Sequence, residues 1–197
     1  RQRGAVLRLS MDGLTPISDA GMTDYFNDNL KPAFKLIGSY DDRKNEYNLT
    51  IDNGVQSYPD SETVSFKENV KGWVSFKSFI PDCGLSMANN YYTFYEGKLF
   101  IHHDETKPRN RFYANQSTSY VEAVLNDGVS IVKNFKTLNY EGDAGWTATV
   151  QTDMQSGVVD SFIEKENKHF NYIKGESGII DTAAFNFQGI GTVNEIQ

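Results

Sequence analysis

Residues 91–102 read YYTFYEGKLFIH, with two aromatic and apolar runs on either side of the central pair EG. Two residues that include glycine between two β runs predict a tight hairpin, because the favoured two-residue turns need positive φ. In that register Phe94 lies opposite Leu99, and Tyr92 lies opposite Ile101. The stretch therefore predicts two antiparallel strands that share an apolar face.

The alternation of polar and apolar residues continues on both sides of this hairpin. Runs of period two that are rich in Phe, Tyr, Val and Ile predict strands, and clusters of Gly, Asn and Asp predict turns between them. About ten short strands with a turn every 8–12 residues indicate a mainly β, antiparallel fold of hairpins, either a β-sandwich or propeller-blade-like. The main strands are expected at 5–9, 34–40, 46–51, 63–67, 73–79, 91–95, 98–102, 119–125, 130–140, 146–152, 162–165 and 169–173.

A complete propeller is not supported by the sequence. Residues 40–47 and the aromatic hairpin after them resemble one propeller blade, but no second copy follows at a period of about 40–50 residues. Strands and helices do not alternate along the chain, so a doubly wound α/β fold is also disfavoured.

One short N-terminal helix interrupts the β pattern. Ser18 is a plausible N-cap, because its hydroxyl can accept a hydrogen bond from a free backbone N–H. The helix must end by Lys31, since Pro32 disfavours helical geometry in the residue before it. An apolar stripe at helical spacing consists of Met22, Tyr25, Phe26 and Leu30.

We expect three segments along the chain: an N-terminal strand and helix at 1–32, an antiparallel β domain at 33–175, and an extended tail at 176–197. The tail is polar apart from an apolar cluster at Phe185 and Phe187. Residues 81–84 are expected to interrupt the strand pattern, and the polar segment 104–116 is expected to be a loop. The chain begins with Arg1, and we expect it to be part of a larger protein.

The composition excludes several classes of protein. The chain has 197 residues, a formal net charge of −7, 13 Phe and 11 Tyr. It is too apolar for a disordered protein, and a sequence-independent grip on nucleic acid needs a basic surface. No apolar run approaches the ~18–20 residues that a membrane-spanning helix needs. Cys83 is the single cysteine, so a disulfide scaffold is ruled out.

The strongest candidate for chemistry is the run His102-His103-Asp104-Glu105. Imidazoles and carboxylates are metal ligands. Adjacent strand residues point to opposite faces, however, so His102 and His103 cannot easily share one ion. His169 lies in another hairpin, and we expect no metal site.

Other candidate groups lack the partners that catalysis needs. Cys83 has no activating neighbour in sequence. The carboxylates Asp41-Asp42 and Glu164/Glu166 lie in expected turns, where solvated charge is the ordinary explanation. Gly189-Ile190-Gly191 lacks the remaining glycine and the strand–helix context of a dinucleotide loop. We therefore expect no catalytic residue, no cofactor and no enzyme activity.

Two patterns point to binding. Cations and aromatics mix in one loop, which could stack on single-stranded nucleic acid, although a protein contact or a packed loop is favoured in an acidic chain. The aromatic excess could also supply a sugar-binding platform, although aromatic pairs stabilise sheets directly. The loop residues are Lys107, Arg109, Arg111, Phe112 and Tyr113, and the platform candidates are Trp73, Trp146, Tyr91, Tyr92 and Tyr95.

Several phrases of the sequence together resemble virion structural proteins of tailed bacteriophages, above all the tail nozzle or muzzle proteins of crAss-like and related short-tailed phages. The resemblance covers roughly residues 15–191. It is carried by the stretches 40–47, GWVSFKSF at 72–79, 91–103, KNFKTLNYEG at 133–142, 162–175 and NFQGIG at 186–191. Family members are much longer than this chain.

The resemblance implies a non-enzymatic subunit of a tail in the virion, assembled in the host cytoplasm. Such a subunit would form a homo-oligomeric ring around the channel through which DNA leaves the capsid. Other tail proteins would be its further partners. An acidic chain would let that DNA slide without binding it. A carbohydrate- or receptor-binding β module on the same virion is the alternative.

Overall fold

The computed structural model describes residues 4–11, 13–54, 61–176, 178 and 192–193. They form two compact units, Arg1–Glu122 and Ala123–Gln197, called here the N-terminal and the C-terminal unit. Every strand pairing in the described part is antiparallel, and α1 is the single helix there, which confirms the mainly β fold class. The boundaries expected at 32/33 and 175/176 remain a prediction, and the cluster at Phe185 and Phe187 lies outside the described residues.

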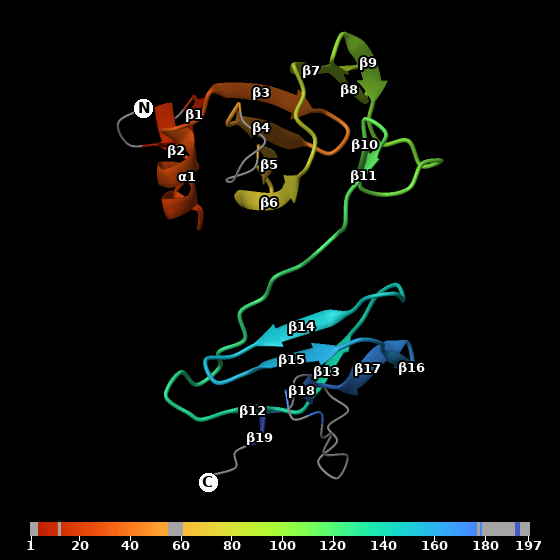
Figure 1. Cartoon of the computed structure of the whole chain (residues 1–197). Helices are drawn as coiled ribbons and strands as arrows, with labels where there is room; N and C mark the ends of the chain where they lie inside the picture. The colour runs from red at the N-terminus through yellow and green to blue at the C-terminus, as the bar shows by residue number, and fades with distance from the viewer. Residues whose placement is uncertain (1–3, 12, 55–60, 177, 179–191, 194–197) are drawn as a thin grey trace. The chain divides into compact units, whose positions relative to one another are not determined.

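The N-terminal unit is built on a four-stranded meander in which consecutive strands pair, as in a propeller blade (Figure 1). The last pairing contains a β-bulge: Ser65 pairs with Ser75, but Phe66 pairs with Trp73, so Val74 is the extra residue. The strands are β3 (Lys35–Asp41), β4 (Glu46–Asp52), β5 (Glu62–Lys67) and β6 (Gly72–Lys77).

One face of this sheet packs against α1 (Thr23–Leu30), and the resulting core follows from the apolar stripe of the helix. Phe26 is completely buried, and its ring lies 4.6 Å from that of Trp73. The core residues are Phe26, Leu30, Ala33, Leu49, Ile51 and Val64, with Met22, Tyr25, Tyr47 and Trp73 partly buried against them.

The start of the helix differs from the prediction. Ser18 is not the N-cap: the helix begins at Thr23, Met22 occupies the cap position, and no side chain caps it. The chain first makes a separate turn that ends at Gly21, whose φ of +77° cannot belong to a helix. The predicted end is confirmed, since α1 ends at Leu30 before Pro32.

The hairpin at residues 91–102 is confirmed in its register. Phe94 pairs with Leu99 and Tyr92 with Ile101, and the turn residues Glu96 and Gly97 have φ of +50° and +71°. A third strand precedes them, so the expected interruption at 81–84 is wrong for its last two residues. The sheet consists of β7 (Cys83–Met87), β8 (Asn90–Tyr95) and β9 (Lys98–Ile101).

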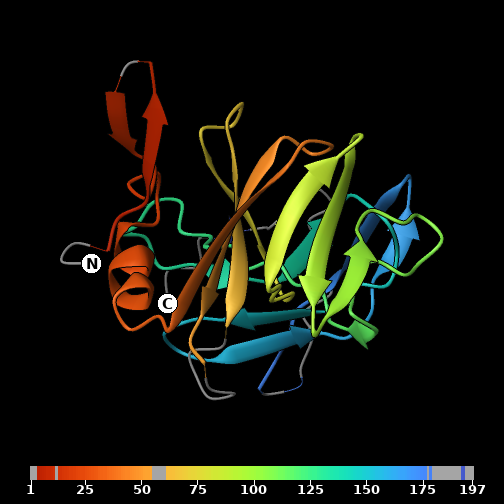
Figure 2. The ribbon, with the colours of Figure 1, turned by 90° about the horizontal axis from the view of Figure 1, so that it is seen from above.

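Two small hairpins complete the N-terminal unit. The first includes part of the strand expected at 5–9, and Figure 2 shows it extending beyond α1. The second lies inside the segment expected to be a loop. They consist of β1 (Leu7–Ser10) with β2 (Gly13–Pro16), and of β10 (Arg111–Phe112) with β11 (Asn115–Gln116).

The strand expected at 119–125 is wrong. The strand expected at 130–140 is present only in part, as two short strands at 134–135 and 137–140. Residues 117–133 have no strand, and Tyr120, Val121 and Val124 are 79–89% exposed. A run of β-forming residues needs a neighbouring strand to become part of a sheet, and propensity alone does not supply one.

The C-terminal unit contains short sheets of two or three strands. The predicted hairpin at 162–173 is confirmed, with Glu166 and Asn167 in its turn at positive φ. The ring of Tyr140 stacks on that of His169 at 4.7 Å, and the buried Nε2 of His169 donates to the Gly142 carbonyl. The strands are β12 (Asn134–Phe135), β13 (Thr137–Tyr140), β14 (Ala148–Gln151), β15 (Ser156–Val159), β16 (Ile163–Lys165), β17 (Lys168–Tyr172), β18 (Lys174–Gly175) and β19 (Thr192–Val193).

The turn between β8 and β9 gives a test of the hairpin. We expect Gly97→Val to lower the stability of the chain by about 1–3 kcal/mol, because a β-branched residue is strained at positive φ. The space around a Cβ at Gly97 is open, so the cost comes from the backbone alone. Gly97→Asn is the matched control, since asparagine tolerates this conformation. Equal melting temperatures for wild type and Gly97→Val would contradict the turn.

Candidate functional site

The face of the meander opposite α1 is polar and buried, and its side chains form a network of hydrogen bonds. Alternate residues of β3, β4 and β5 point into it, and the strand β8 covers part of it. We call it the polar layer. Its buried members on the meander are Ser39, Asp41, Glu46, Asn48, Thr50, Thr63 and Ser65.

Tyr91 joins β8 to the meander. Its side chain is 1% exposed, and its hydroxyl lies 2.7 Å from Oγ of Ser39. Burial raises the pKa of Tyr91, and the hydrogen bond from Ser39 works in the opposite direction. A Cβ at Gly84 would lie 2.8 Å from the Tyr91 hydroxyl oxygen, so the close approach of β7 requires glycine there.

Asp41 is the most heavily bonded carboxylate of the polar layer. Its Oδ1 accepts hydrogen bonds from the backbone N–H groups of Arg43 and Lys44, at 3.0 and 3.2 Å. Its Oδ2 lies 2.5 Å from Nε2 of His103, beyond the end of β9. The carboxylate therefore fixes the β3–β4 turn and joins it to the segment that follows β9.

His102 points into the same region and is held as a neutral imidazole. Its Nε2 lies 2.7 Å from Oγ1 of Thr93, which also accepts a hydrogen bond from the Tyr113 hydroxyl at 2.8 Å. Burial lowers the pKa of His102 from 6.5 to about 4, with a further lowering by His103, while Asp41 raises it. The ring packs 4.8 Å from that of Phe79. These contacts give His102 a structural role.

The predicted cluster His102-His103-Asp104-Glu105 is not brought together. The two imidazole rings are 6.3 Å apart and bind different partners. Asp104 accepts hydrogen bonds from Thr106, and Glu105 pairs with Arg43. Among the residues that the structure describes, no group of three or more His, Cys, Asp or Glu side chains could hold a metal ion.

The remaining candidates also lie apart. Cys83 is exposed on β7, where it pairs with Phe94. Asp42 is exposed beside the polar layer, and Glu164 and Glu166 are exposed in the C-terminal unit.

The aromatic residues of the basic loop and of the platform are explained mainly by packing, whereas the loop cations Lys107, Arg109 and Arg111 are exposed. Tyr113 stacks on Tyr95 with ring centroids 4.4 Å apart, and Phe112 packs 5.1 Å from Phe79. Tyr91 is buried, and Trp73 donates its indole N–H to the Ile17 carbonyl. Trp146 is 39% exposed and is the most accessible of the five platform candidates.

Sequence reasoning missed the polar layer itself. The alternation of polar and apolar residues at 46–51 predicts a half-buried strand, whereas Asn48 and Thr50, on its polar side, are each 1% exposed. The usable signal was the concentration of hydroxyl and amide side chains, which can satisfy one another in a buried layer. Thr50 and Thr63 do so at 2.6 Å, as do Ser65 and Asn48.

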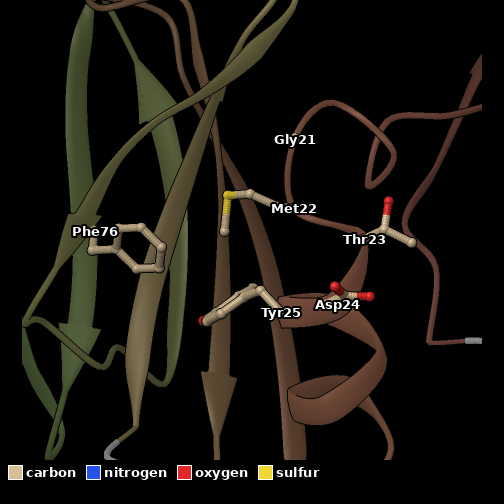
Figure 3. Close-up of a pocket in the computed structure, with 6 residues that line it drawn as sticks. All are labelled: Gly21, Met22, Thr23, Asp24, Tyr25 and Phe76. Atoms are coloured by element: carbon tan, nitrogen blue, oxygen red, sulfur yellow. The ribbon is translucent and has the colours of Figure 1, made fainter. Parts of the chain in front are cut away.

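A shallow hollow of about 420 Å³ lies where α1 meets the edge of the meander (Figure 3). It is lined by Gly21, Met22, Thr23, Asp24, Tyr25 and Phe76. Tyr25 donates a hydrogen bond of 2.5 Å to Glu62, and burial, together with that carboxylate, raises its pKa. Asp24 is the only charged residue of the lining, so the hollow has no pair of groups for acid–base chemistry.

The hydrogen bond between β8 and the meander can be tested with a double-mutant cycle. We expect Tyr91→Phe to lower stability by about 1–3 kcal/mol, because it leaves the Ser39 hydroxyl unpaired. Adding Ser39→Ala should cost less than the sum of the single changes. Tyr92→Phe, on the other face of β8, is the control and should stay within about 0.5 kcal/mol. Additive losses in urea denaturation would contradict the pairing.

The lowered pKa of His102 predicts acid sensitivity. Since the unfolded imidazole keeps a pKa near 6.5 and the folded one has about 4, protons bind the unfolded chain more tightly in that window. Stability is therefore full above pH 6.5 and falls by on the order of 3 kcal/mol as the pH approaches 4. His102→Gln should show a smaller difference in melting temperature between pH 7.5 and 4.5. An identical difference would contradict a neutral buried His102.

Comparison with known proteins finds a family model that matches part of the chain. Residues 107–176 match the family model described as Crassvirus muzzle protein C-terminal domain. The matched residues include β10 and β11 of the N-terminal unit and β12 to β18 of the C-terminal unit. No curated protein matches the chain.

The family match covers two of the stretches that carried the resemblance in the sequence, at 133–142 and 162–175. The stretch at 186–191 lies outside both the match and the described residues. The family supports a structural role in a phage tail. The resemblance to the tail muzzle proteins of crAss-like phages is thus confirmed, through the match of residues 107–176 to their C-terminal domain.

Proposed function

We propose that the chain is a non-enzymatic muzzle-type subunit that forms part of the conduit for DNA ejection in a phage tail. The observation that carries this proposal is the match of residues 107–176 to the muzzle C-terminal domain. The subunit would reside in the tail of the virion after assembly in the host cytoplasm. Its partners would be other tail proteins and further copies of itself in a ring.

The arrangement of the candidate catalytic groups supports a non-enzymatic role. His102 is 8% exposed and its Nε2 is hydrogen-bonded to Thr93, and Nε2 of His103 is hydrogen-bonded to Asp41. The carboxylate of Asp41 is 1% exposed. Groups that catalyse proton transfer must reach a substrate atom, and these side chains instead stabilise the fold.

The charge of the chain supports a conduit through which DNA slides. A formal net charge of −7 disfavours a sequence-independent grip on phosphates.

Across the described residues, no helix is long and apolar enough to cross a membrane. Exposed apolar side chains are numerous on the strands of the N-terminal unit, and such residues suit interfaces between subunits.

A receptor-binding module on the same virion is the alternative. It is favoured by one observation, the 39% exposure of Trp146 in the C-terminal unit, beside Tyr140. A stacking platform for a sugar needs an accessible ring of this kind. A glycan array with wild type and Trp146→Ala tests it, and absence of any signal in the wild type removes this alternative.

Particle analysis tests the structural role. We expect peptides of this chain in mass spectra of purified virions, and we expect a reconstruction of the tail to place several symmetry-related copies around its channel. Native mass spectrometry of the full-length protein should show a ring-sized oligomer. A protein that is absent from virions and strictly monomeric would overturn the proposal.

A further inference from the structure

The hairpin of β1 and β2 has an apolar face that points away from its own unit. Leu9 pairs with Leu14 and Leu7 pairs with Pro16, so these four residues share one face. Leu7, Leu9 and Leu14 are 54%, 78% and 65% exposed. On the opposite face, Arg8 pairs with Glu68 of the same unit.

The hairpin turns its polar face toward its own unit and exposes its apolar face, although it is the apolar face that a hairpin needs to cover. A two-stranded hairpin is at best marginally stable in water, and its apolar face is normally covered. Within the part of the chain that the structure describes, β1 and β2 pair only with each other. The polar face is directed toward the body, and the apolar face is left for a contact outside the N-terminal unit.

The sheet of β7, β8 and β9 presents a second apolar face in the same unit. The register forms rows across it, in which Leu85, Tyr92 and Ile101 lie side by side, as do Cys83, Phe94 and Leu99. Leu85, Leu99 and Ile101 are 43–57% exposed, and Met87 is 62% exposed. The other face of this sheet carries Tyr91 and Thr93 into the polar layer.

The two faces lie at opposite ends of the N-terminal unit, with the meander between them in both views (Figures 1 and 2). One copy of the unit cannot bring them together. At about 180 Å² for a fully exposed side chain, the leucines of the hairpin and the four exposed side chains of the β7–β9 face present roughly 740 Å² of apolar surface together, about three quarters of the ~1,000 Å² of a biological interface. A contact between two different faces is head-to-tail, and it closes into a ring when the rotation permits.

The charges indicate which partner fits. Copies of a chain with a formal net charge of −7 repel one another, so a contact between them needs faces without charge. Leu7, Leu9, Leu14 and Pro16 are uncharged, as are all the residues in the rows of the β7–β9 face. Two uncharged apolar faces on one chain can meet between two copies without bringing like charges together, so a second copy of the chain is the partner that fits.

We propose that the hairpin of one copy docks its apolar face on the β7–β9 face of the next copy. The proposal rests on the proposed ring of tail subunits and names the surfaces that would build it. The hairpin acts as an arm, and Leu9 and Leu14 are its central contacts. The acceptor is the surface around Leu85, Leu99 and Ile101.

The single native cysteine offers a direct test, because Cys83 is exposed on the acceptor face. In the full chain, Leu9→Cys should be joined to Cys83 of another copy by a short bismaleimide, and a ladder of covalent oligomers should appear on a denaturing gel. Thr15→Cys, which is exposed on the other face of the hairpin, is the matched control and should give several-fold less product. Adding Cys83→Ser to Leu9→Cys should abolish the ladder.

A second variant separates docking from folding. Leu9→Glu with Leu14→Glu should weaken self-association by roughly a hundredfold, because charges would enter an apolar contact. The melting temperature of the monomer should not change, since both leucines are exposed within the chain. Native mass spectrometry and thermal melting provide these readings.

The outcomes distinguish the interface from the function. Oligomers that persist in the Leu9→Glu/Leu14→Glu variant would overturn this interface and leave the ring itself intact. Absence of a ladder from Leu9→Cys, while the wild-type protein is oligomeric, would do the same. A lowered melting temperature with intact oligomers would overturn it too, since the hairpin would then be covered by its own chain. A wild-type full-length protein that is monomeric and absent from virions would overturn both the interface and the proposed function.

Discussion

The N-terminal unit depends on the burial of the Asp41 carboxylate with all its bonds made. A buried charge without partners is costly, and here two backbone N–H groups and an imidazole surround it. The requirement fixes three things at once: the β3–β4 turn, the end of β9 and the distance between the two sheets. The neighbouring pairs Ser39–Tyr91 and Thr93–His102 repeat the same logic across the polar layer. Apolar packing against α1 supplies stability on one side of the meander, and hydrogen bonds supply a unique register on the other.

Local chemistry explains what could be predicted. The turn at Glu96-Gly97 needs only two residues at positive φ, so the sequence around it predicts the hairpin and its pairs correctly. The hairpin at 162–173 is also predicted from its charged turn, although Lys168, which is expected in the turn, pairs with Lys165 as part of β17. Pro32 ends the helix through its own ring, which again requires no knowledge of the fold.

The predictions of secondary structure and burial fail where contacts with residues distant in the sequence determine the local structure. The helix starts late because Gly21 adopts a left-handed conformation inside a separate turn. Strand β7 is not predicted because glycine at position 84 is typical of a turn. In the structure, the absence of a Cβ at Gly84 leaves room for Tyr91 and Ser39. The residues around Tyr120 have β propensity but no neighbouring strand in the described structure. The polar layer is not predicted for the same reason, since Asn48 and Thr50 are expected on the polar side of a half-buried strand and are buried only in the folded unit. The structural role in a phage tail is indicated by the resemblance of several stretches of the sequence to muzzle proteins, and not by a group of catalytic residues.

The two tryptophans divide between the two compact units, and this gives the chain a built-in optical probe. Trp73 packs between Phe26 and Phe66 in the core beneath α1, while Trp146 is 39% exposed in the C-terminal unit. An indole packed against aromatic rings emits at shorter wavelength than a more hydrated one. Intrinsic fluorescence should therefore resolve into a blue and a red component, each reporting one unit. The loss of the blue component follows the release of α1 from the meander, and no label is needed to observe it.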